Sequence, residues 1–135
     1  MRIFKKMRAA PEVRNVLKVL DAAEVKHGSP GFALVREVIE RSALDNPEPL
    51  VHAVRAGLSP HQAVYTQLAN VAGDHLESGR FHVHRGVLDP TSATAKSLLQ
   101  LHDSALDDLV SEGFISSTQA EKQKRDLRTA LSQVG

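Results

Sequence analysis

Proline placement is the feature that most restricts how this chain can fold. Five of its six prolines stand just ahead of apolar residues spaced three and four apart, and these are Pro11, Pro30, Pro47, Pro60 and Pro90. Proline suits the first turn of a helix, where its missing N–H would have no partner, and it disrupts a helix interior. Apolar spacing of three and four places side chains on one helix face. The pattern therefore predicts helices over 11–26, 30–43, 47–56, 60–78 and 90–112.

Serine and glutamine mark two of the helix starts more sharply. Ser59 with Gln62, and Ser116 with Gln119, have the spacing of a capping box, in which each side chain accepts a hydrogen bond from the other residue's backbone N–H. The second box lies at the start of a further apolar pattern. It predicts a sixth helix over 116–133.

Glycine residues and the lack of linkers complete the predicted architecture. Gly57 and Gly113 follow the last apolar residue of their helices, where a left-handed residue commonly ends a helix. No internal repeat, low-complexity tract or linker interrupts the pattern. We therefore expect an all-α fold, a single compact bundle of five to six helices over residues 11–135 that ends in an αα-hairpin, preceded by a basic N-terminal arm over 1–10.

Composition and motifs exclude several kinds of site. The chain has no cysteine, which rules out disulfides, thiolate zinc sites, iron–sulfur clusters and cysteine nucleophiles within it. It contains no phosphate-binding glycine loop, no nucleophile elbow and no H-E-x-x-H zinc motif. Glu24 and His27 match the E-x-x-H element of di-iron bundles, but such a site needs a second copy, which we do not find. The motifs therefore give no reason to expect an enzyme.

Charge is distributed unevenly along the chain. The first eight residues carry +4, whereas the whole chain carries +1, so the remainder is acidic at −3. Duplex nucleic acid is not an expected partner, because proteins that bind it present a broad basic surface. The arm is a frayed terminus, a packed first turn, or a weak contact with an anionic membrane surface. No segment has the pattern of a secretory signal or a membrane-spanning helix, so we expect a cytoplasmic protein.

Three of the seven histidines lie close together in the sequence. His75 falls near the end of a predicted helix, and His82 and His84 alternate with apolar residues in the next segment, whose period of two indicates extended or irregular structure. Three imidazoles can hold a divalent metal such as zinc and leave one position open for water. The simpler alternative is that His75 is a hydrogen-bonded core residue and the other two are solvated. We therefore expect no cofactor, and the alternative is a divalent metal bound by His75, His82 and His84.

The same segment contains a candidate anion site. Arg80 and Arg85 flank the two histidines, and arginine offers a two-pronged donor to phosphate or carboxylate. The alternative is that both arginines form ordinary surface ion pairs. The acidic residues available for such pairs are Asp74, Glu77 and Asp89.

The last third of the chain resembles a known family. A leucine-rich helix is followed by a glycine turn and a capped helix, with the residues Gly113, Phe114, Ile115, Ser116, Gln119, Lys124 and Leu127. This arrangement is similar to the short C-terminal hairpin of the SHOCT family, although Ser116, Gln119 and Ala120 replace its usual threonine, glutamate and aromatic residue. The resemblance covers about a quarter of the chain, residues 106–127. It implies an interaction or oligomerisation element with no enzymatic role.

Leucine excess on the helix over 90–112 supports the same interpretation. The apolar residues that span more than one side of this helix are Leu98, Leu99, Leu101, Leu106, Leu109 and Val110. Either several helices of this chain or a partner chain must cover such a surface. The leading hypothesis is a non-enzymatic protein that binds another protein or itself through the hairpin over 95–134.

Two further expectations concern individual residues. The alternative function is a metal- or anion-binding protein, a small enzyme or sensor, that uses His75, His82, His84 and Arg85. His102 lies among the leucines at heptad-like spacing, so we expect it to be buried and hydrogen-bonded.

Overall fold

The structure is a computed structural model that describes residues 9–28, 30–78 and 93–132. Over these ranges the chain forms six α-helices and no strand, which confirms the prediction of an all-α bundle. The helices are α2 (Pro11–His27), α3 (Pro30–Asp45), α4 (Glu48–Arg55), α5 (Pro60–Ser78), α6 (Ala93–Ser111) and α7 (Ser117–Ser132). Each predicted helix lies close to an observed one. None of the described helices is long and apolar enough to cross a membrane, and a cytoplasmic location stays a prediction.

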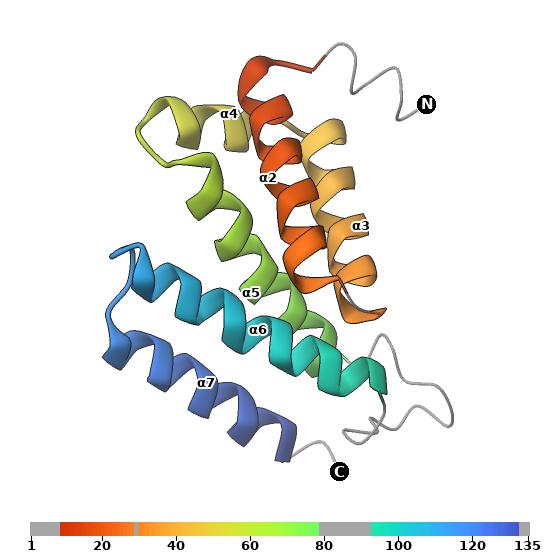
Figure 1. The fold of residues 1–135 in the computed structure, drawn as a ribbon, viewed down its shortest axis with the longest axis vertical. Helices are drawn as coiled ribbons and strands as arrows, with labels where there is room; N and C mark the ends of the chain where they lie inside the picture. The colour runs from red at the N-terminus through yellow and green to blue at the C-terminus, as the bar shows by residue number, and fades with distance from the viewer. Residues whose placement is uncertain (1–8, 29, 79–92, 133–135) are drawn as a thin grey trace.

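The helices pack in two groups, and neighbouring helices within each group run antiparallel (Figure 1). The first group is α2 and α3, and the second is α5, α6 and α7. α2 and α3 lie side by side, and α4 connects them to α5 at one end of the molecule. α5 and α6 share the most extensive contact between any two described helices, and α3 also packs against both of them. α7 runs along α6 at the opposite edge of the molecule from α4 and reaches α5 as well. α6 is therefore enclosed from several sides.

Both predicted capping boxes are present. The Ser59 Oγ accepts a hydrogen bond from the Gln62 amide at 3.0 Å, and the Gln62 side chain accepts one from the Ser59 amide at 3.3 Å. The corresponding distances for Ser116 and Gln119 are 3.1 and 2.9 Å. These bonds satisfy N–H groups that a helix start otherwise leaves unpaired.

The core is built from the apolar stripes that the sequence predicts. The apolar residues of α2 that recur at spacings of three and four are buried, and they are Val13, Val16, Leu17, Leu20 and Ala23. On α6, Leu98, Leu101, Leu106 and Leu109 are buried, while Leu99 and Val110 are partly buried. α3, α5 and α7 of the same chain cover this helix. Its leucine excess is therefore explained by packing within one chain and does not itself require a partner.

Arg36 joins α2 to α3. It pairs with Glu40, one turn later on α3, at 3.3 Å. Glu40 is only 7% exposed, so this pair is not on a solvated outer face. Arg36 also binds Asp21 and, at 3.1 Å, Glu24, both on α2. Burial alone would lower the pKa of Arg36, but its hydrogen bond to Asp21 and the nearby carboxylates outweigh this effect and raise the pKa.

Candidate functional site

Of the predicted metal ligands, the structure describes only His75. It lies near the end of α5, is 8% exposed, and lines a surface pocket with Asp74 and Glu77. His82 and His84, as well as the predicted anion ligands Arg80 and Arg85, lie outside the described residues. Within the described ranges no group of three or more His, Asp or Glu side chains is placed to hold a metal ion.

The hydrogen bonding of His75 shows which of its ring nitrogens carries a proton. Nδ1 lies 3.1 Å from the carbonyl oxygen of Val71, one turn earlier on α5. A carbonyl can only accept a hydrogen bond, so Nδ1 donates, and Nε2 is the nitrogen that carries the lone pair whenever the ring is neutral. This bond satisfies the side chain as a core residue, and it also matches the way in which metal-binding histidines are commonly oriented.

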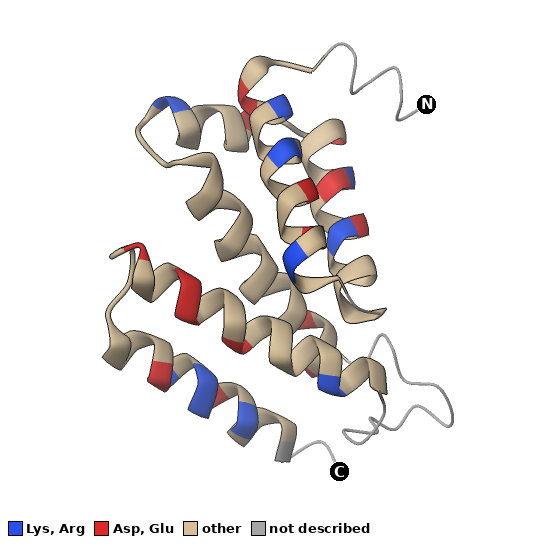
Figure 2. Cartoon of the chain, in the orientation of Figure 1, with Lys and Arg blue, Asp and Glu red and all other residues tan. Residues whose placement is uncertain are grey.

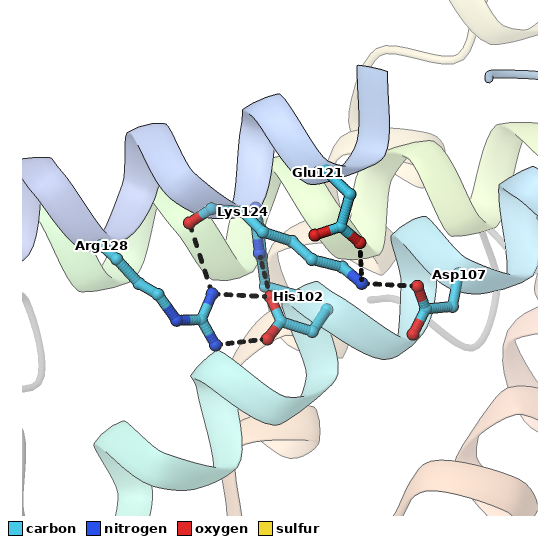
Figure 3. Close-up of polar contacts among 6 residues, drawn as sticks. His102, Asp107, Glu121, Lys124 and Arg128 are labelled. Carbon is cyan, nitrogen blue, oxygen red and sulfur yellow. Dashed lines mark hydrogen bonds and ion pairs between the residues drawn. The ribbon is translucent and has the colours of Figure 1, made fainter. Parts of the chain in front are cut away.

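The α6–α7 hairpin, residues 93–132, carries the most connected polar cluster of the described structure (Figure 3). Arg128 on α7 donates to Asp103 on α6 with an Nη2–Oδ2 distance of 2.6 Å. Lys124 binds Asp107 at 2.6 Å, so two cations of α7 are paired with two acids of α6. His102 is 6% exposed and its Nδ1 lies 3.1 Å from Asp103 Oδ1, which confirms that it is buried and hydrogen-bonded.

These contacts alter the acidity of the groups that make them. Partial burial would raise the pKa of Asp103, but its hydrogen bonds with Arg128 and His102 outweigh burial and lower it. The hydrogen bond to Asp107 raises the pKa of Lys124, and the one to Asp103 raises that of Arg128. Asp103, Lys124 and Arg128 are therefore all ionised at neutral pH.

α7 contacts the rest of the chain along a narrow stripe and leaves its outer face exposed. Ala120 and Leu127 are buried, whereas Glu121 and Arg125, one turn apart, are exposed and line a shallow groove together with Lys124, with which Glu121 forms an ion pair at 3.5 Å. Arg125 makes no ion pair with any residue that the structure describes. Phe114, in the turn between α6 and α7, is 42% exposed. Figure 2 shows that basic and acidic residues both occur along α7.

A second polar cluster brings together residues that sequence analysis did not connect. His61 and Tyr65 on α5 stack with ring centroids 4.3 Å apart, and the ring of His27 from α2 meets Tyr65 edge-on at 6.0 Å. His61 Nε2 lies 2.5 Å from Asp108 Oδ1 on α6. Glu24, which forms the E-x-x-H match with His27, is ion-paired with Arg36 at 3.1 Å.

Burial is the largest cause of the pKa shifts of Tyr65 and His27, two of the aromatic groups in this cluster. Desolvation raises the pKa of Tyr65, and the charge of Asp108 raises it further. Desolvation and the neighbouring Lys26 lower the pKa of His27, while Asp108 opposes them. The His27 Nε2 is buried and has no hydrogen-bond partner in the described structure. The spacing of these residues along the chain gives no signal, because three different helices supply them.

The comparisons with known proteins give no family to this chain. No protein-family description, curated protein or solved structure matches it. The SHOCT-like pattern of the last two helices thus stays a resemblance.

Proposed function

We propose that this chain is a non-enzymatic helical protein that binds a second copy of itself through the outer face of the α6–α7 hairpin. The observation that carries the proposal is Phe114, a large apolar side chain that is 42% exposed in the turn of this hairpin. Aromatic residues of this kind commonly anchor protein interfaces. The resemblance of the same segment to an oligomerisation element supports the choice.

The charges on the outer face of α7 are self-complementary. Glu121 and Arg125 are both exposed and share one side of the helix. Two copies of α7 can pair antiparallel through this side, with the twofold axis at the level of residue 123 along the helix. Each Glu121 then lies opposite the other copy's Arg125. A twofold interface repeats every contact, so this salt bridge forms twice. In the same register, Phe114 lies opposite the last turn of the other α7, where Leu131 is partly buried.

Light scattering across micromolar protein concentrations tests this proposal. The wild type should shift from monomer to dimer as its concentration rises, and Phe114→Ser should weaken the dimer by about tenfold, because the exposed aromatic anchor is lost. Lys18→Glu on α2 is the matched control, since Lys18 is exposed and lies on another helix. A wild type that stays monomeric over the whole range would remove self-association and leave only a different protein as partner.

A metal or anion site at the end of α5 is the second candidate function. It is favoured by the His75 Nδ1 bond to Val71 O, which leaves Nε2 free to act as a ligand. Elemental analysis of untagged protein and calorimetric titration with zinc test it. The prediction is one zinc per chain, with binding lost in His75→Ala and kept in the control His52→Ala on α4.

The anion version of this candidate has its own test. Phosphate should raise the thermal unfolding midpoint of the wild type and not that of a chain with Arg80 and Arg85 changed to alanine. If the wild type contains no metal and shows no thermal shift with zinc, iron or phosphate, the second candidate has no support.

A further inference from the structure

A pocket of about 210 Å³ is lined by residues of α4 and of the helices that α4 packs near. α4 lies at the end of the molecule away from α7 (Figure 1). The floor of the pocket includes Val16 of α2, Ile39 of α3 and Val64 of α5, which are 0 to 4% exposed. Leu50 and Ala53 of α4 close the other side. The pocket is partly open to solvent, so a small molecule has a path into an apolar space.

The pocket exists because α4 is incompletely packed. α4 separates apolar and polar residues more sharply than any other described helix, yet it has no fully buried residue. Its apolar side chains Leu50, Val51 and Val54 are only partly buried. Protein interiors are normally packed as densely as organic crystals. An occupant between α4 and the floor would complete the burial of this apolar surface.

The residues that line the pocket include polar ones, and one of these has an unsatisfied hydroxyl. The polar residues among those that line the pocket are Ser42, Asn46, Thr66 and Gln67. The Thr66 Oγ1 is fully buried and has no hydrogen-bond partner in the described structure. Buried hydroxyl groups almost always find a partner, so this one is the lining group that most lacks a hydrogen bond; a ligand supplies that bond once the Thr66 side chain turns its Oγ1 toward the cavity. The expected ligand therefore carries at least one hydrogen-bonding group.

The charge of the lining residues and the volume of the pocket restrict the class of ligand further. None of the described residues that line the pocket is charged. A charged ligand would lose its hydration without gaining an opposite charge, which disfavours carboxylates and amines. A dry apolar cavity of about 150 Å³ is large enough to bind benzene, so 210 Å³ accommodates a somewhat larger molecule.

We propose that this pocket binds a small neutral molecule with an apolar body and a single hydroxyl or carbonyl group, which hydrogen-bonds to Thr66. Such sites are typically concave and mostly apolar, with a few polar groups that fix the orientation of the ligand. The pocket shares no residue with the outer face of α7. Ligand binding and self-association are therefore separate properties of the chain.

Three related probes test the ligand class on the full chain by NMR titration. 2-Naphthol has the apolar body and one hydroxyl, naphthalene lacks the hydroxyl, and 2-naphthoate replaces it with a charge. The wild type should bind 2-naphthol about 3- to 10-fold more tightly than naphthalene, the factor that one hydrogen bond supplies. 2-Naphthoate should bind most weakly. The amide signals that shift should come from α3, α4 and α5.

Two variants locate the site, and thermal unfolding of each confirms that it is folded. Thr66→Val keeps the side-chain shape and should abolish the preference for 2-naphthol over naphthalene. Ala53→Leu fills the pocket from α4 and should weaken both ligands by about tenfold or more, whereas the control Ala56→Leu, at an exposed position just after α4, should not. The proposal is overturned if the wild type binds neither naphthalene nor 2-naphthol, if Thr66→Val keeps the preference, or if folded Ala53→Leu binds as tightly as the wild type.

Discussion

Asp103 and Arg128 lie 25 residues apart in sequence and are joined by a hydrogen bond of 2.6 Å between Oδ2 and Nη2. The same carboxylate accepts a hydrogen bond from His102 Nδ1 at 3.1 Å. Few apolar side chains of α7 are fully buried, with Ala120 and Leu127 as the clear cases. The contact between α6 and α7 therefore depends on this cluster more than is usual for helices in a core.

The first prediction concerns the strength of this contact. Asp103→Asn should lower the free energy of unfolding by about 1 kcal/mol, a value kept small because Arg128 is half-exposed and solvent weakens the pair. Asp126→Asn is the control, since both members of the Lys122–Asp126 pair are more than 60% exposed. Urea unfolding followed by circular dichroism measures both variants. Equal losses in the two variants would show that Asp103 has no special role.

The second prediction is the pH dependence that the same carboxylate produces. The pKa of Asp103 is lower in the folded chain than its ordinary value near 4. The unfolded chain therefore binds the proton more readily, and the contribution of Asp103 is complete above about pH 5 and lost as the pH falls through the folded pKa. The wild type should lose more stability than Asp103→Asn between about pH 5 and 2. Parallel curves for the two proteins would contradict this assignment.

The third prediction contrasts two glycines. A Cβ atom on Gly31 would lie 2.6 Å from Ser97 Oγ and 2.9 Å from the Leu98 backbone nitrogen, so Gly31→Ala must force α3 and α6 apart. We expect a loss of about 1 to 3 kcal/mol. At Gly73, inside α5, a Cβ would make only an ordinary 3.6 Å contact with His102. Gly73→Ala should gain about 0.5 to 1 kcal/mol from helix propensity.

Thermal and urea unfolding of both alanine variants measure these effects. A Gly31→Ala protein as stable as the wild type would mean that α3 and α6 are not in the close contact described above. A loss in Gly73→Ala would place His102 nearer to α5 than the structure has it.

The fourth prediction concerns His27. Its folded-state pKa is lowered, chiefly by desolvation, so the unfolded chain binds the proton more readily as the pH falls below about 6.5. Stability should decrease as the pH falls from about 7.5 and level off below the folded pKa. His27→Phe removes both the titration and the unpaired Nε2, so it should flatten this dependence and unfold at the same or a higher temperature.

His52→Phe is the control for this experiment, because His52 is exposed on α4. The control should keep the wild-type dependence on pH. Unchanged behaviour of His27→Phe between pH 7.5 and 5.5 would assign the titration to another group.

The helices could be predicted from the sequence because their signals are local. The Ser59 and Ser116 capping boxes, and the positive φ angles of Gly57 and Gly113, depend on residues within one turn of each other. The stripe over α2 likewise needs only its own spacing. Such signals survive in a single sequence because the backbone hydrogen bonds at a helix end must be satisfied nearby.

The contacts between helices could not be predicted in this way. Nothing near Gly31 indicates that its amide bonds Ser97 Oγ, 66 residues away, at 3.0 Å. His27, Tyr65 and Asp108 meet because α2, α5 and α6 cross, and the pocket under α4 forms where packing stays incomplete. The spacing of the leucines on α6 left open whether this chain or a partner chain covers them, and neighbouring helices of this chain do so. Each of these features is set by tertiary packing, which the spacing of residues along one helix does not encode.

Sedimentation equilibrium of a charge-swap series tests the proposed twofold pairing of α7 most directly. Arg125→Glu and Glu121→Arg should each weaken the dimer by about tenfold, because each single change places like charges opposite one another twice. The double variant, Glu121→Arg with Arg125→Glu, restores opposite charges across the twofold axis and should dimerise about as well as the wild type. A wild type that stays monomeric, or a double variant no better than the single ones, would contradict the account.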